Sequence, residues 1–274
     1  MNKQQEILKK NPFKQITKGI KEIEQVKHER ATTGNTYKIK GNNNQLYKIS
    51  YYDTIEKAKI VEKNVKKFKK IFPKFYKREG KALLFKWIPG KTLRNNLTLK
   101  NLQQLGKIYG EVHNINDIKK ERTFQKKINK YLNQIKETKF FNKTTINKIE
   151  KELKNLSKNL DSPIILEIND PNLDNFIQNK GKIYFVDEEG FNHNIKGRGW
   201  TGLYKKLTKA QKQAFLKGYN KTHDSNYFTK DYEKFMNYLH IIISTGHRLN
   251  KYGPNNKRAK ESLKELTNYF KQNL

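Results

Sequence analysis

The apolar residues change their spacing along the chain, and this change limits the folds that it can adopt. From residue 32, TTGNTYKIKGNNNQLYKISYY alternates apolar and polar residues around GNNN, which predicts a β-hairpin. The next segment, DTIEKAKIVEKNVKKFKKIF, has apolar residues at helical spacing and predicts an amphipathic helix capped by Asp53 or Thr54. The segment KFYKREGKALLFKWIPGKTL then predicts two short strands around a turn that contains glycine. The second strand ends at Pro89 and Gly90.

The remainder of the chain has mainly helical spacing. LTLKNLQQLGKIYGEVHNIN, the stretch over residues 124–160 and the stretch from Lys209 to the end all predict helices. Two short apolar runs, PIILEIND and KIYFVDEEG, interrupt them and predict a small hairpin. We therefore expect an α+β fold with a leading helical segment over residues 1–30, a small β-rich lobe over 31–88 and a larger, mainly helical lobe over 89–274.

The charge of the chain is strongly positive. Its 59 lysines and arginines exceed its 26 aspartates and glutamates, which gives a formal net charge of +33. Lysine outnumbers arginine by 52 to 7, and the basic residues are scattered, which is typical of an A/T-rich genome rather than of a nucleic-acid-binding stripe. Whatever its origin, this charge favours anionic partners and disfavours cationic ones.

Two absences in the sequence exclude classes of protein. The chain has no cysteine, which excludes disulfides, thiolate zinc sites, iron–sulfur clusters and a cysteine nucleophile. No apolar run reaches the roughly 18 residues of a membrane span, and the start, MNKQQEILKKNPFKQ, lacks the apolar stretch of a signal peptide. We therefore expect a cytoplasmic protein without a membrane span.

The segment INDPNLDN, followed by YFVDEEG, has the residue types of a phosphoryl-transfer site. Such transfer to a hydroxyl needs a carboxylate that orients the hydroxyl and oxygen ligands that hold Mg²⁺ against the phosphates. Asp170 could be that catalytic base, and Asn175 and Asp187 could hold the metal. The alternative interpretation is a polar turn followed by an acidic residue at the end of a strand.

The first lobe offers candidates for the nucleotide. Thr33, Gly34, Asn35 and Thr36 lie in the first hairpin, where amides and hydroxyls can cover phosphates. Lys48 lies in the following strand and could reach the phosphates.

The predicted helix after this strand offers a partner for Lys48. Glu62 lies beside the apolar face of the helix and could pair with the lysine. Glu56 is closer to the helix start, where a negative charge favours the helix dipole, so we prefer Glu62 as the partner.

Together these motifs resemble the protein-kinase-like small-molecule phosphotransferases, the aminoglycoside phosphotransferase and choline kinase group. The resemblance covers residues 30–220 and rests on TTGNTYKI, YKI, LLFKWIPGKTL, LGKIYGEVHNIN, INDPNLDN and YFVDEEG, in that order. It implies a bilobal protein-kinase-like fold, with ATP near Phe85, Trp87 and Ile88, Mg²⁺ on Asn175 and Asp187, and Asp170 as the catalytic base.

Two positions depart from the family pattern. Ile168 and Asn169 stand where the family usually has His-Gly, a brace for the catalytic loop, so a non-catalytic member is an open alternative. Glu188 and Glu189 follow Asp187, where many relatives have an aromatic residue. They could add metal ligation, bind a cationic substrate group or be solvated.

Residues after the metal segment are candidates for acceptor binding. His193, Arg198 and Trp200 lie in FNHNIKGRGW, where a guanidinium beside an indole suits a phosphate, a carboxylate or a base. A packed tryptophan and a surface arginine are the alternative. For His113, packing or capping is the preferred interpretation.

The function that we predict is transfer of the γ-phosphoryl group of ATP, with Mg²⁺, to a hydroxyl of a small molecule. An RNA kinase, for example one that acts on tRNA, is the alternative that the positive charge favours. A nucleotide-binding pseudokinase and a pure nucleic-acid-binding protein are further alternatives. The oligomeric state is not predicted.

Overall fold

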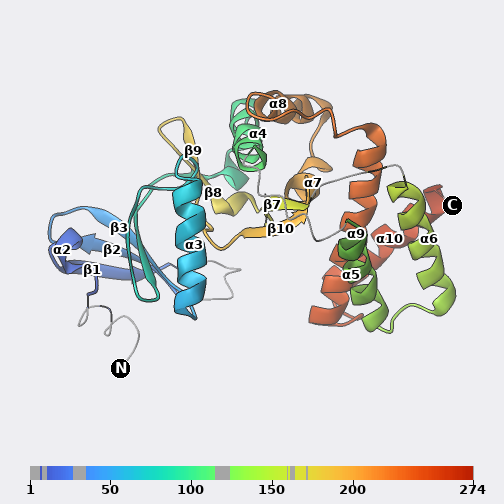
Figure 1. The fold of residues 1–274 in the computed structure, drawn as a ribbon, viewed down its shortest axis with the longest axis horizontal. Helices are drawn as coiled ribbons and strands as arrows, with labels where there is room; N and C mark the ends of the chain where they lie inside the picture. The colour runs from blue at the N-terminus through green and yellow to red at the C-terminus, as the bar shows by residue number, and fades with distance from the viewer. Residues whose placement is uncertain are drawn as a thin grey trace. The chain divides into compact units, whose positions relative to one another are not determined.

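The computed structural model describes residues 7, 11–26, 35–114, 124–158, 160, 164–170 and 172–273. The chain packs as two compact units, each coloured by residue number in Figure 1. Unit 1 comprises residues up to Leu97 together with Asn172–Glu189, and unit 2 comprises Thr98–Pro171 and Gly190–Leu274. Residues 89–97, which we assigned to the helical lobe, thus pack with unit 1. Among the described residues, no helix is long and apolar enough to cross a membrane.

Unit 1 contains a five-stranded antiparallel sheet with the strand order β1-β2-β3-β5-β4. Both predicted hairpins are confirmed. In the first, Lys38 of β2 lies opposite Lys48 of β3. The strands are β1 (Ile20–Gln25), β2 (Thr36–Gly41), β3 (Leu46–Tyr51), β4 (Phe75–Glu79) and β5 (Ala82–Lys86).

The prediction of a helix over the leading segment is wrong for most of its described part. Only α2 (Lys14–Thr17) is helical between residues 11 and 26, and it ends where Lys18 has a φ of 57° and Gly19 a φ of 108°. These left-handed conformations turn the chain, and the following residues then extend along β2 as the edge strand β1. The hydrogen bonds that β2 offers outweigh the helical spacing of the isoleucines.

The amphipathic helix predicted after the first hairpin is α3 (Ile55–Lys67). Thr54, not Asp53, is its N-cap, because the Thr54 side chain accepts a hydrogen bond from the backbone N–H of Lys57. The helix buries Ala58, Val61 and Val65, while its lysines remain on the other face.

The second, three-stranded sheet of unit 1 has the order β6-β8-β9. We expected a hairpin between PIILEIND and KIYFVDEEG, and this pairing is wrong. β9 pairs instead with β8 through a two-residue turn in which Lys180 and Gly181 both have positive φ. The elements here are β6 (Lys91–Thr92), the 3₁₀ turns η1 (Leu93–Asn95) and η2 (Leu173–Asn175), β8 (Phe176–Asn179) and β9 (Lys182–Phe185).

Unit 2 is mainly helical. One apolar cluster lies among α5, α6, α9 and α10, and includes Ile135, Leu153, Phe235 and Leu266. Its helices are α4 (Leu99–His113), α5 (Phe124–Glu137), α6 (Lys143–Ser157), α7 (Arg198–Tyr204), α8 (Lys209–Tyr219), α9 (Lys230–Tyr252) and α10 (Lys257–Asn273).

Helices α4 and α8 pack closely because each has a glycine at the contact. A Cβ atom at Gly106 would lie 1.9 Å from the carbonyl oxygen of Phe215, and one at Gly218 would lie 1.7 Å from that of Gln103. No side chain therefore fits at either position.

One antiparallel strand pair completes unit 2. β7 (Ile164–Ile168) is fully buried, and β10 (Phe191–Ile195) pairs with it so that Phe191 lies opposite Ile168. Since Asp170 follows β7 by two residues, this strand pair fixes the start of the segment that carries it.

Candidate active site

Lys48 forms a buried ion pair in unit 1. Its Nζ atom lies 2.7 Å and 2.9 Å from the two carboxylate oxygens of Glu188, and it donates to the carbonyl oxygen of Val186 at 2.6 Å. Lys48 is 9% exposed and Glu188 is 4% exposed. The interpretation of Glu188 as a solvated residue is therefore wrong, and both of its oxygens are occupied by the lysine rather than directed to an acceptor.

The expected partner of Lys48, Glu62, forms other ion pairs. Glu62 accepts from Nε of Arg78 at 2.6 Å, and Nζ of Lys66 lies 2.7 Å from its other oxygen. Partial burial raises the pKa of Glu62, but the hydrogen bonds from Lys66 and Arg78 outweigh that effect and hold the pKa below its usual range. The structure thus does not pair Lys48 with Glu62, because Arg78 on β4 takes the carboxylate.

Glu189, the next residue after Glu188, is bound by a second lysine. Nζ of Lys57, on α3, lies 2.5 Å from Glu189 Oε2 and 3.9 Å from Asp53 Oδ2. The hydrogen bond with Glu189 is the main cause that raises the pKa of Lys57. Burial raises the pKa of Tyr52 well above its usual value, and the charges of Glu188, Glu189 and Asp187 add to this effect.

Asp187 and Asn175 have the chemistry of a magnesium site. The side-chain amide of Asn175 donates to Asp187 Oδ2 at 3.3 Å, so the two side chains lie side by side. Mg²⁺ binds proteins through one or two oxygen side chains and completes its shell with water and phosphate oxygens, so this pair fits the ion. Within the described part of the chain, no group of three or more His, Cys, Asp or Glu residues could hold a metal.

The residues predicted to contact the nucleotide have mixed exposure. Asn35 and Thr36 are partly exposed at the start of β2, whereas Thr33 and Gly34 lie outside the described residues. The larger candidates lie on or after β5: Phe85 is fully buried, Ile88 is 8% exposed, and Trp87 is partly exposed with Nζ of Lys38 5.5 Å from its ring centre.

In unit 2, polar contacts fix the residues around Asp170. The backbone N–H of Asn169 donates to the carbonyl of Gly190 at 2.7 Å, and its side-chain oxygen accepts from Asn194 at 3.0 Å. Asn194 in turn accepts from the hydroxyl of Tyr131 at 2.9 Å. These contacts hold the residue that precedes Asp170, at the position where the family pattern has glycine.

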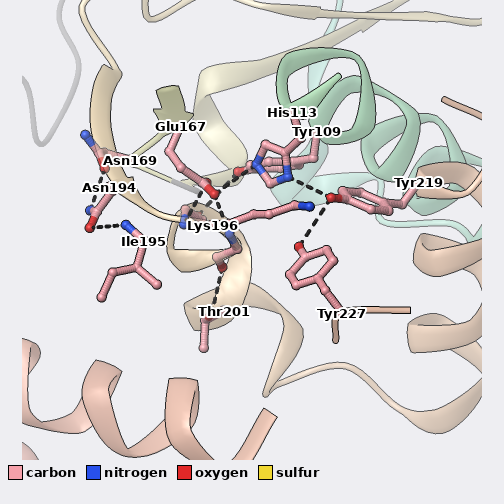
Figure 2. Close-up of polar contacts among 12 residues, drawn as sticks. Tyr109, His113, Glu167, Asn169, Asn194, Ile195, Lys196, Thr201, Tyr219 and Tyr227 are labelled. Atoms are coloured by element: carbon pink, nitrogen blue, oxygen red, sulfur yellow. Dashed lines mark hydrogen bonds and ion pairs between the residues drawn. The ribbon is translucent and has the colours of Figure 1, made fainter. Parts of the chain in front are cut away.

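A buried network lies behind this segment, and Figure 2 shows its members. Glu167, on β7, accepts from the backbone N–H groups of Gly197 and Gly199, the second at 3.0 Å. Nε2 of His113 lies 2.9 Å from Glu167 Oε1, and its Nδ1 lies 2.8 Å from the hydroxyl of Tyr219. His113 is thus packed, as predicted, but it also joins α4 to β7 and α8.

Sequence reasoning overlooked Glu167, because it stands inside the apolar run PIILEIND. A single acid within a run that is otherwise apolar was the available signal. Such a residue in a buried strand requires hydrogen-bond partners, and here backbone amides and a histidine provide them.

The three candidates for acceptor binding have different environments. Trp200 is fully buried, with its ring centre 4.5 Å from that of Phe228, so the packing interpretation holds and direct acceptor contact is wrong for Trp200. His193 lies on β10, and its side chain is partly exposed. Arg198 is half-buried, with its Nη1 3.4 Å from Nδ1 of His240, and burial lowers its pKa.

Comparisons with solved structures identify the fold. The choline kinase LicA from Streptococcus pneumoniae superposes with a TM-score of 0.68 at 19% identity, covering 97% of this chain and 100% of that one. A Plasmodium vivax ethanolamine kinase gives 0.66 at 17% identity, covering 90% and 80%. The fold is protein-kinase-like. An AMP-bound spectinomycin phosphotransferase shares it, with a TM-score of 0.63, 15% identity and coverage of 97% and 94%.

The likeness to these proteins is found by comparing structures and not by comparing sequences. No protein-family model matches the sequence, and no curated protein matches it. At identities of 19% or less, the likeness to the solved structures concerns the fold, which confirms the predicted α+β architecture with a β-rich part and a larger helical part.

Proposed function

We propose that this chain is an ATP- and Mg²⁺-dependent phosphotransferase that moves the γ-phosphoryl group to a hydroxyl of a small molecule. The observation that carries the proposal is the cluster in unit 1, where the Lys48 ammonium donates to the carbonyl of Val186, next to Asp187. The lysine that could bind phosphates thus contacts the residue before Asp187, and Asp187 in turn accepts a hydrogen bond from Asn175, its partner in the oxygen pair for magnesium. The kinase-like fold supports this interpretation.

Each residue then has a role that its chemistry allows. Lys48 binds and orients the phosphates, and Asn175 and Asp187 hold the metal. Mg²⁺, when bound, neutralises charge that develops on the transferred phosphoryl group. Asp170 accepts the hydrogen bond of the acceptor hydroxyl and takes its proton as the new O–P bond forms. The bond between the γ-phosphorus and the β–γ bridging oxygen breaks in the same step, and ADP leaves with that oxygen. Catalysis consists of positioning and electrostatics, without a covalent enzyme intermediate.

The nature of the acceptor is proposed from the fold neighbours. The structures with the same fold include two kinases of small amino alcohols and a phosphotransferase of spectinomycin. The net charge of +33 does not suit a polycationic acceptor at the surface, so we favour a neutral or singly charged small molecule. Of the comparisons, none supports transfer to RNA.

A transfer assay tests the proposal. The protein is incubated with Mg²⁺ and ATP labelled at the γ-phosphate, and is offered a small-molecule extract and total RNA in parallel. We expect label in the small-molecule pool and a loss of at least about 100-fold in Asp170→Ala, with ATP binding retained. Asp187→Ala is expected to lose metal-dependent nucleotide binding as well.

Other outcomes distinguish the alternatives. Label in RNA would replace the small-molecule acceptor by RNA. ATP binding without any transfer would make the protein a pseudokinase. Equal turnover of Asp170→Ala and the wild type would refute the mechanism.

A further inference from the structure

We propose that Glu188, rather than a glutamate of helix α3, is the residue that positions Lys48 for the phosphates of ATP. This inference rests on the proposed function and names a positioning residue for the same site. It is carried by the buried Lys48–Glu188 ion pair, by the different engagement of Glu62, and by the second lysine that holds Glu189.

The ion pair fixes the lysine in a defined orientation. The ammonium group has three N–H donors, and the carbonyl of Val186 and the two oxygens of Glu188 surround it at 2.6–2.9 Å. With both side chains almost fully buried, solvent hardly screens their attraction. A flexible lysine side chain is thereby restricted to one position, and a phosphate oxygen can take one of the donors without displacing the carboxylate from the others.

Glu62 is unsuited to this task in the structure. Its two oxygens interact with Arg78 and Lys66, at 2.6 Å and 2.7 Å. The guanidinium is a permanently charged partner. If Lys48 took the place of Arg78 beside Glu62, the ion pairs Arg78–Glu62 and Lys48–Glu188 would break and only Lys48–Glu62 would form.

Helix α3 nevertheless contributes to the cluster around Lys48 and Glu188, but it supplies a lysine and not the glutamate that we expected. Lys57 of α3 binds Glu189 at 2.5 Å, so the helix supplies a lysine and the segment after β9 supplies the carboxylate. The two glutamates that follow Asp187 are thus held by lysines from two elements, β3 and α3. Their charges are balanced, which leaves the Asp187 carboxylate as the acid of this segment that fits the metal.

This arrangement ties the position of Lys48, the proposed phosphate-binding cation, to that of Asp187, the proposed metal-binding residue. Lys48 contacts both the residue before Asp187 and the residue after it. A displacement of Glu188 therefore changes the position of Lys48 relative to Asp187. Precise placement of these charges matters more in the transition state than in the ground state, where ATP phosphates can attract a mobile lysine.

Steady-state kinetics and ATP binding test the inference on the full chain. Glu188→Gln keeps the shape but removes the charge, and we expect kcat to fall by more than about tenfold while KM for ATP changes by less than about threefold. Glu188→Asp retains the charge and should restore part of kcat. The matched control Glu22→Gln, which breaks an exposed ion pair with Lys40, should leave both parameters unchanged.

A second measurement does not depend on activity. In a double-mutant cycle with Lys48→Met and Glu188→Gln, the unfolding equilibrium in urea should show a coupling of at least about tenfold, or about 1.4 kcal/mol. An absent coupling, or a kcat that falls in Glu62→Gln but not in Glu188→Gln, would overturn the inference. If the wild type binds no ATP with Mg²⁺, the proposed function itself fails, and the positioning role fails with it.

Discussion

Glu167 and His113 contact each other inside unit 2, with 2.9 Å between Oε1 and Nε2 and both side chains fully buried. The contact joins the strand that leads to Asp170 with helix α4. Ile168 and Asn169 stand before Asp170, where the phosphotransferases that the motifs resemble usually have His-Gly. Glu167 with His113, on one side, and Asn169 with Asn194, on the other, provide a different set of braces. The segment before Asp170 is therefore supported by contacts among residues of this chain.

The stability of unit 2 should depend strongly on Glu167. Glu167→Ala leaves the N–H groups of Gly197 and Gly199 and the ring of His113 without their acceptor in a buried site. We expect the free energy of unfolding, measured in urea, to fall by about 3–5 kcal/mol. Glu24→Ala, at an exposed ion pair on β1, is the matched control and should cost less than about 1 kcal/mol. Equal losses in the two variants would contradict the role of the network.

Gly199 should tolerate no side chain. A Cβ atom there would lie 2.0 Å from the carbonyl oxygen of Ile168 and 2.5 Å from Glu167 Oε2. We expect Gly199→Ala to displace the strand before Asp170, to lower the free energy of unfolding by more than about 2 kcal/mol and to reduce phosphoryl transfer.

Gly246, inside α9, is the control for this substitution. Its nearest neighbour would be Cγ1 of the buried Ile135 at 3.2 Å, which a shift of a few tenths of an ångström relieves, so Gly246→Ala should cost much less than Gly199→Ala. Melting temperatures of the two variants provide the comparison. A Gly199→Ala protein as stable as Gly246→Ala would show that β7 can move away from α7 at little cost.

Local patterns in the sequence were sufficient to predict most elements of unit 1. Alternating residues around GNNN gave the β2–β3 hairpin, and the lysine-rich amphipathic segment gave α3. Strand β1 was missed, because an edge strand owes its conformation to the neighbouring β2 rather than to its own spacing. The pairing of β7 with β10 was missed for a related reason, since strand partners depend on the tertiary fold.

The candidate site shows the same limit at the level of side chains. Residue type and order single out Lys48, Asn175 and Asp187 as candidates, and their role in the site stays a prediction. Type and order could not select the partner of Lys48, because Arg78 competes for Glu62 and only the fold determines which cation reaches which carboxylate. Charge alone is a poor guide to pairing in a chain with 59 basic residues.

Acid should destabilise the protein through His240. Burial, with the cationic side chains around it, lowers the pKa of His240 from 6.5 to about 2 in the folded state. Below pH 6.5 the unfolded chain then binds a proton that the folded chain does not, so stability falls as the pH falls. The cationic side chains that lower this pKa are those of Arg198, Lys205, Lys206 and Arg248.

Urea unfolding at pH 7 and pH 5 measures this effect. Between these values the wild type should lose about 2 kcal/mol more than His240→Gln. His247→Gln, at an exposed position of the same helix, should lose as much as the wild type. If the loss were the same in His240→Gln and the wild type, the histidine would not be the titrating group.

Asn194 should affect turnover more than nucleotide binding. Its side-chain amide donates to Asn169, and its oxygen accepts from Tyr131, so Asn194→Ala frees the residue before Asp170. Because a base that is misplaced by about 1 Å can cost up to about 100-fold in rate, we expect kcat to fall by about tenfold or more. The affinity for ATP, measured by calorimetry, should stay within about twofold, since Lys48 and Asp187 are unaltered. Asn192→Ala, an exposed position on the same strand, is the control and should keep full activity. If Asn194→Ala instead lost ATP affinity and kept kcat, Asn194 would support the nucleotide site and not the segment that carries Asp170.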